Sequence, residues 1–163
     1  MKPSLFVGVD LTDSYARAPR EVDVAILDAQ TGQAVFDKLL WPSQGADCAR
    51  AAADLAGMLG TDKAVLMADG PQALATMPNN TPLVERYLGT PGHTPWQVPE
   101  PRTRPFAGYI RTSIEFFDAL IGAGFKLAEL AKGENSANLF EAYPGAAWPR
   151  WHRCAQPLGW TGG

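Results

Sequence analysis

The stretch Ser4–Asp10 reads SLFVGVD and has the pattern of a short buried strand that ends in an acid. Its side chains alternate between two faces, with Leu5, Val7 and Val9 on one and Phe6, Gly8 and Asp10 on the other. Two more strand patterns follow at 23–29 (DVAILDA) and 34–41 (AVFDKLLW), with the turn signal Thr31-Gly32 between them. The chain therefore opens with three consecutive strands, which we expect to pair antiparallel.

After this hairpin the pattern changes to alternating helix and strand. Residues 46–59 carry apolar side chains at helical spacing, and Gly60 ends the predicted helix. The apolar run 64–68 (AVLMA) then predicts a strand that lies parallel to the first and is buried on both faces. Pro71 suits the first position of a further helix. A helix is predicted from about Gly108, and a fifth short strand at 139–142 (LFEA).

A proline-rich segment separates the fourth strand from the later helix. The residues from Thr76 to Pro105 include seven prolines, so they cannot be regular structure throughout. We expect a long, mobile loop that covers the acidic edge of the sheet, with one helical turn around 83–87.

Composition limits the class of protein. The chain has 163 residues, which predicts a single domain over 1–163. Its formal net charge of -3 excludes a whole-surface positive field for nucleic acid, so a polyanion must meet a local patch. The sequence has no apolar run of the roughly 20 residues that a membrane span needs and no signal-peptide pattern at its start. These patterns predict a cytoplasmic protein without membrane contact, and they leave the oligomeric state open.

Three acids stand at strand ends, and this coincidence carries the functional prediction. Asp10 ends the first predicted strand, Asp69 follows the fourth, and Glu141 lies in the fifth. If these strands are parallel neighbours, their carboxyl ends share one edge of the sheet, where α/β folds place ligands. Clustered carboxylates repel one another unless a proton or cation intervenes, and oxygen ligands suit Mg²⁺ or Mn²⁺. The sequence thus predicts a metal site.

Each acid also has a purely structural interpretation. Asp10 can cap a turn with Thr12 or Ser14, and Asp69 precedes Gly-Pro at a predicted helix start, where a capping acid is common. Glu141 can form an ion pair with Arg150 or Arg153. The interleaved Arg and Trp residues of the C-terminal tail can bind phosphate and stack bases, or can anchor the tail to the sheet.

The motifs VGVDLTDS (7–14), MADGPQAL (67–74) and LFEAYP (139–144), in this order, resemble the domain of unknown function 429 family of predicted ribonuclease-H-like nucleases. The resemblance covers about 5–151. It implies a five-stranded mixed sheet, three antiparallel strands then two parallel ones, flanked by helices. It also implies that Asp10, Asp69 and Glu141 are catalytic metal ligands for phosphodiester hydrolysis. Arginines of the family's middle region are expected at Arg102, Arg104 or Arg111, where they would bind a nucleic acid or nucleotide substrate.

Two other functions compete with the nuclease. The stretch GVDLTDS also resembles the first phosphate loop of the actin, sugar-kinase and heat-shock ATPase superfamily, although those proteins use two such lobes. The third possibility is a nonenzymatic binding domain with a degenerate site. The last 22 residues contain no Asp or Glu, whereas related nucleases commonly add a carboxylate there. We therefore expect weak binding of one divalent ion and slow cleavage or none. The family resemblance further implies a C-terminal part beyond this domain.

Overall fold

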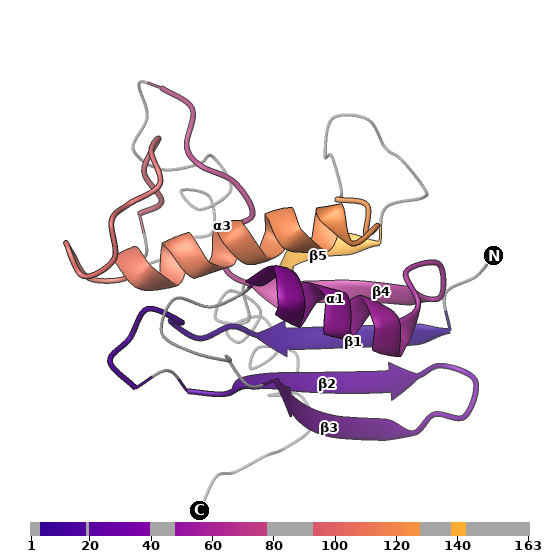
Figure 1. Cartoon of the computed structure of the whole chain (residues 1–163). Coiled ribbons are helices and arrows are strands. Elements are labelled where there is room, and N and C mark those ends of the chain that lie inside the picture. Colours follow the sequence, from indigo (N-terminus) through magenta and orange to yellow (C-terminus); the bar gives the residue numbers. More distant parts are fainter. Residues whose placement is uncertain (1–3, 19, 40–47, 78–92, 128–137, 143–163) are drawn as a thin grey trace, which may run out of the picture.

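The computed structural model describes residues 4–18, 20–39, 48–77, 93–127 and 138–142, and these form an α/β fold around one mixed sheet (Figure 1). The five strands lie in the order β3-β2-β1-β4-β5. Their bounds are β1 Leu5–Asp10, β2 Val22–Asp28, β3 Ala34–Leu39, β4 Ala64–Asp69 and β5 Leu139–Ala142. The first three strands pair antiparallel, and β4 and β5 pair parallel, as predicted. The predicted mixed five-stranded sheet is therefore confirmed.

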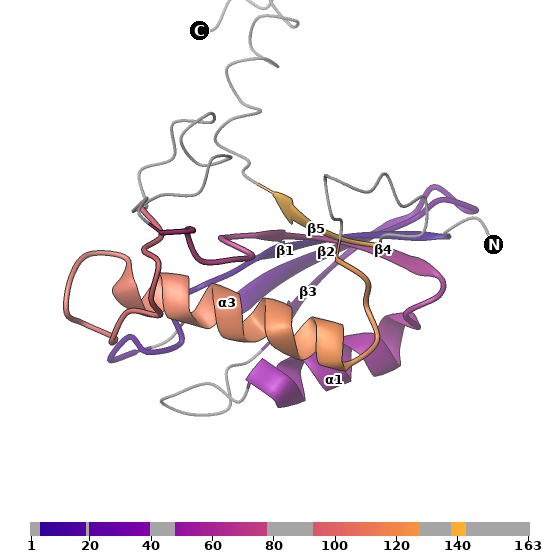
Figure 2. The ribbon, with the colours of Figure 1, turned by 90° about the horizontal axis from the view of Figure 1, so that it is seen from above.

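Both described helices cover the same face of the sheet, as the view from above shows (Figure 2). They are α1 (Cys48–Leu59) and α3 (Ala107–Gly122). Helix α1 turns its apolar stripe inward, with Ala52 and Leu55 fully buried. Phe116, Phe117 and Leu120 of α3 are fully buried too, against the strand side chains Val7 and Leu66. One face of the sheet thus carries the core.

The other face of the sheet has no described helix over it, and we call it the open face. The register places three rows of side chains there. The first row is Ala34, Leu27, Phe6 and Val65; the second is Phe36, Ala25, Gly8, Met67 and Phe140; the third is Lys38, Asp23, Asp10, Asp69 and Ala142. The first two rows are apolar and the third is charged. The open face is therefore amphipathic, and its charged end coincides with the carboxyl ends of β1 and β4.

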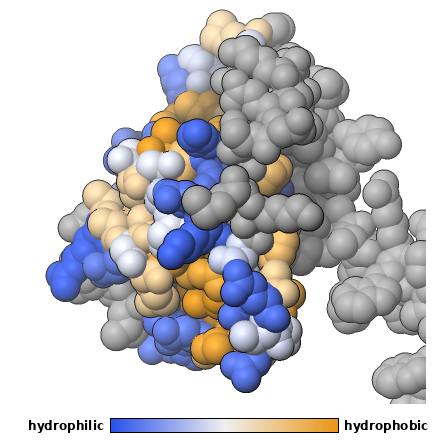
Figure 3. All heavy atoms as spheres, turned by 90° about the vertical axis from the view of Figure 1, so that its right-hand side faces the viewer, coloured by the Kyte–Doolittle hydropathy of each residue, from blue (hydrophilic) through white to orange (hydrophobic). Residues whose placement is uncertain are grey.

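Figure 3 views the end of the sheet opposite the charged row, where β2 turns into β3. Apolar side chains reach the surface there between hydrophilic ones. Phe36 is 81% exposed, which is unusual for so large an apolar side chain.

The predicted helix after Pro71 does not form among the residues that the structure describes. Residues 71–77 are irregular, with bends. In a helix the backbone N–H of Ala75 would bond to the carbonyl of Pro71, but here it donates to the carbonyl of Pro95 at 3.0 Å. Residues 93–106 are likewise without helix or strand. The predicted turn at 83–87 and the tail from 143 onward, with Arg150 and Arg153, lie outside the described residues.

Candidate functional site

Asp10 and Asp69 are direct neighbours in the sheet. They are the last residues of β1 and β4, and the parallel register pairs one with the other. Because both residues end parallel strands at the same edge, the topology itself brings two carboxylates together. This is the pairing that the sequence predicted for these two acids.

The environment of Asp69 makes its charge costly. Burial and then the negative charge of Asp10 raise the pKa of the Asp69 carboxyl above its usual value. A hydrogen bond from the Tyr109 hydroxyl works in the opposite direction and lowers this pKa. Two like charges on neighbouring strands favour either a proton or a bound cation between them.

Asp23 and Lys38 extend the row of charges, and the sequence prediction missed both. Asp23 lies opposite Asp10 in the antiparallel pairing of β2 with β1, and Lys38 lies opposite Asp23 on β3. The Lys38 ammonium forms ion pairs of 3.2 Å with both Asp23 and Glu21. These contacts raise the pKa of Lys38, so it stays charged. The row therefore contains three aspartates and one lysine in register.

Tyr109 links the charged end of the sheet to α3. Burial, and then the negative charges of Asp69, Asp10 and Glu141, raise the pKa of the Tyr109 hydroxyl. The hydroxyl therefore keeps its proton at neutral pH and acts as a donor. This residue was also missed, because it follows the proline-rich segment and no local pattern places it beside Asp69.

Gly70 allows this close approach between α3 and the end of β4. Its φ of +134° lies in the region that glycine adopts more readily than other residues. A Cβ at this position would overlap the Ser113 side chain and would lie 3.1 Å from the Tyr109 hydroxyl. Only a glycine here lets Tyr109 reach Asp69 without displacing α3.

Glu141 lies on the strand beside Asp69 but takes a different role in the described contacts. Its register partner is Ala68, so alternation places it on the face of the helices, whereas Asp69 belongs to the open face. Its carboxylate accepts a hydrogen bond of 3.3 Å from the backbone N–H of Gln72. Across the described ranges there is no group of three His, Cys, Asp or Glu side chains that could hold a metal ion. The three predicted acids share one end of the sheet, but only Asp10 and Asp69 are register partners.

The three candidate arginines all have partners within the chain. Arg102 donates to the backbone carbonyl of Tyr15 at 3.0 and 3.2 Å, and Arg104 donates to that of His93 at 2.9 Å. Arg111 donates to Glu115 at 2.8 Å and to Glu100 at 3.4 Å. The Glu100–Arg111 contact links the proline-rich segment to α3, and the contacts of Arg102 link the same segment to the loop after β1.

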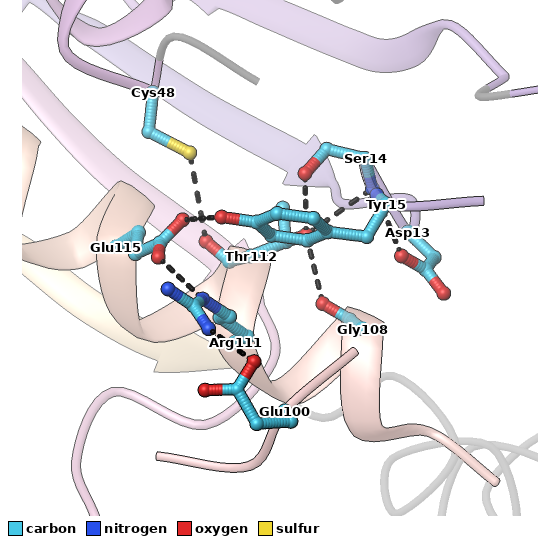
Figure 4. Close-up of polar contacts among 9 residues, drawn as sticks. All are labelled: Asp13, Ser14, Tyr15, Cys48, Glu100, Gly108, Arg111, Thr112 and Glu115. Atoms are coloured by element: carbon cyan, nitrogen blue, oxygen red, sulfur yellow. Dashed lines mark hydrogen bonds and ion pairs between the residues drawn. The ribbon is translucent and has the colours of Figure 1, made fainter. Parts of the chain in front are cut away.

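Arg111 also takes part in the polar cluster of Figure 4. Its guanidinium lies 5.3 Å from the centre of the Tyr15 ring, and the Tyr15 hydroxyl donates to Glu115 at 2.6 Å. Burial, and then the bond to Glu115, raise the pKa of Tyr15 to about 12. Because its cation is paired and stacked, Arg111 is built into the fold and is the least accessible of the three arginines to a substrate.

The loop after β1 is packed against α3 and does not form an open phosphate cradle. Ser14 is fully buried, and its hydroxyl lies 2.7 Å from the hydroxyl of Thr112 (Figure 4). Thr12 is almost buried, and its hydroxyl donates to the carbonyl of Arg20 at 2.8 Å. These hydroxyls are engaged within the protein, which argues against the ATPase interpretation of GVDLTDS.

Comparisons with known proteins add nothing to this geometry, since no protein-family model, no curated protein and no solved structure matches the chain. Neither of the helices that the structure describes is long and apolar enough to cross a membrane.

Proposed function

We propose that the protein is a ribonuclease-H-like phosphodiester hydrolase that uses Mg²⁺ or Mn²⁺ at Asp10 and Asp69. The observation that carries this proposal is the in-register pair of carboxylates at the ends of two adjacent parallel strands. The raised pKa of the Asp69 carboxyl supports it, because the pair is costly without a compensating cation.

The residues present fit a divalent ion of this kind. Mg²⁺ prefers oxygen ligands, keeps several waters, and is commonly bound through one or two carboxylates together with phosphate oxygens of a substrate. A third protein carboxylate is therefore not required for binding. Asp10, Asp23 and Asp69 bring three negative charges to the charged row, and its one positive charge, Lys38, is shared with Glu21 outside the row, so negative charge is in excess there. A divalent cation would reduce that excess.

The bound ion would supply stabilisation of charge on the phosphate and activation of water. The chain's own residues would arrange the site. Tyr109 lies beside Asp69, and its hydroxyl favours the charged form of that carboxylate. Glu141 holds the turn after β4 through the N–H of Gln72, and it is the nearest further carboxylate on the neighbouring strand.

We expect slow turnover from this arrangement. The metal ion acts by stabilising charge in the transition state. Compared with a site that has more carboxylate ligands, a site with two register-paired carboxylates should therefore lose more in the rate of hydrolysis than in metal affinity. Arg102 and Arg104 bond only to backbone carbonyls in the contacts described above, so their charges remain available to attract a phosphate backbone over the same end of the molecule.

The proposal is tested by hydrolysis of a fluorescently labelled single-stranded oligonucleotide with Mn²⁺. We expect slow, metal-dependent cleavage by the wild type and at least a tenfold loss, about 1.4 kcal/mol, in Asp10→Asn and Asp69→Asn. Asp118→Asn is the matched control, because Asp118 is an exposed acid of α3. The cleavage rate of a Glu141→Gln variant measures whether this third acid contributes to hydrolysis. Cleavage that persists unchanged in both Asp10→Asn and Asp69→Asn would refute this site.

A further inference from the structure

The charged row borders a hollow in the open face, with a volume of about 800 Å³. This volume is in the range of small-molecule sites. The hollow follows from the register: the second row reads large, small, small, large across four strands, as Phe36, Ala25, Gly8 and Met67. Neighbouring strands are about 4.8 Å apart, so Phe36 and Met67 lie about 14 Å apart with two small residues between them.

The floor at Gly8 is open space. A Cβ built on Gly8 meets no atom within 4 Å, and Gly8 does not have a positive φ. The glycine is therefore not required by the backbone or by a close neighbour. Together with Ala25 it leaves room above the sheet between the aromatic ring of Phe36 and the thioether of Met67.

The two ends of the hollow differ in chemistry. Its floor and walls are apolar, whereas the charged row lines its other end, with three acids and one base: Asp10, Asp23, Asp69 and Lys38. Successive residues on one face of a strand are about 7 Å apart, so a ligand seated over Gly8 places its next group beside Asp10. A suitable ligand has a flat apolar part and an anionic group at that distance.

We propose that this hollow is the seat of a nucleotide, with its base over Gly8 between Phe36 and Met67 and its phosphate at Lys38 and the Asp10–Asp69 pair. This inference rests on the proposed function, because the cation at the pair makes the acidic end attractive to phosphate. Bases stack on aromatic side chains with little sequence preference, and methionine sulfur packs well against aromatic rings. The nucleotide is either free or the unpaired end of a single strand, and both present the same chemistry.

The test uses calorimetric titration of adenosine 5′-monophosphate in the presence of Mn²⁺. We expect binding by the wild type, and at least tenfold weaker binding of adenosine and of inorganic phosphate, since each lacks one half of the ligand. Gly8→Leu fills the hollow and should weaken nucleotide binding by at least about tenfold while Mn²⁺ binding is retained. Gly57→Leu is the matched control, because a Cβ on Gly57 of α1 also meets no atom within 4 Å.

The outcomes separate this inference from the proposed function. Mn²⁺ binding without nucleotide binding, or equal nucleotide affinity in wild type and Gly8→Leu, would overturn the nucleotide seat and leave the metal pair standing. Loss of Mn²⁺ binding in Asp10→Asn together with a nucleotide-induced shift of the Gly8 amide resonance in the wild type would support both. A concentration-dependent dimer that Gly8→Leu disrupts, with no response to nucleotide, would assign the open face to a second copy and overturn the proposal. A single-stranded dinucleotide titrated in parallel distinguishes a free nucleotide from a strand end by its relative affinity.

Discussion

Asp69 lies opposite Asp10 in the parallel pairing of β4 with β1, so two carboxylates that end adjacent strands face the same side of the sheet. Like charges directly opposite one another in a sheet are destabilising. The fold therefore maintains a local electrostatic cost at the edge where α/β proteins bind ligands, and this cost can be measured by removing either charge.

We predict that Asp10→Asn stabilises the metal-free protein at pH 7 by about 0.2–1 kcal/mol, because it removes the repulsion with Asp69. The pKa of Asp69 is higher in the folded than in the unfolded state, so ionisation at neutral pH disfavours folding. The gain should be present above the folded pKa and should vanish as pH falls below the unfolded value of about 3.8. Urea unfolding of both proteins at pH 7 and pH 3 checks this. A variant that is less stable at pH 7 would show that Asp10 serves mainly as a turn cap.

Tyr109→Phe should raise the pKa of the Asp69 carboxyl further, because the hydroxyl that stabilises its charged form is removed. A carboxyl-detected NMR titration measures the shift. Tyr15→Phe is the control, since Tyr15 donates to Glu115 and is not among the groups that shift the pKa of Asp69. Identical Asp69 titration curves in wild type and Tyr109→Phe would mean that the hydroxyl does not contact Asp69 in solution.

Thr112→Val should lower the free energy of unfolding by about 1–3 kcal/mol, because it leaves buried polar groups of Ser14 without a partner. The Thr112 hydroxyl receives the Ser14 N–H at 3.1 Å, contacts the Ser14 hydroxyl and donates to the carbonyl of Gly108 at 2.9 Å. Thr112→Ser keeps these bonds and should retain most of the stability. Equal losses in the two variants would point to the methyl group and not to the hydrogen bonds.

Gly70→Ala should destabilise the fold by about 1–3 kcal/mol, because its φ of +134° is strained for any other residue and its Cβ would overlap Ser113. Gly8→Ala is the contrasting variant, since nothing lies within 4 Å of its added carbon. Thermal unfolding of the two proteins compares them directly. Similar melting temperatures would show that α3 shifts easily away from the end of β4.

Much of the fold was predictable from local patterns. The strand alternation in 4–10, the helix stripe in 46–59 and the order of elements gave the sheet topology, because each element has to bury one apolar face or stripe. The Asp10–Asp69 pair followed from that topology. The Asp23–Lys38 pair could also have been predicted, because the hairpin turn determines which residues of β2 and β3 face each other. The turn is closed by a bond of 2.9 Å from the Asp28 N–H to the Gln33 carbonyl, and this register places Lys38 opposite Asp23.

The rest of the site depends on contacts between distant segments. Tyr109 meets Asp69 only because α3 packs beside the end of β4, and no local pattern in the sequence specifies that approach. The irregular course of residues 71–77 was equally hard to predict, because the N–H groups of Gln72 and Ala75 bond to Glu141 and Pro95 and not within a helix. Pro71 favours a helix start but does not require one.

Metal binding at the Asp10–Asp69 pair can be measured by a Mn²⁺ titration followed by electron paramagnetic resonance, which detects free Mn²⁺ without relying on activity. We predict one weak site in the wild type and an affinity at least about tenfold lower in both Asp10→Asn and Asp69→Asn, while Asp118→Asn binds as the wild type does. Equal Mn²⁺ affinity in all four proteins, or none in the wild type, would contradict the claim that the Asp10–Asp69 pair is a metal site.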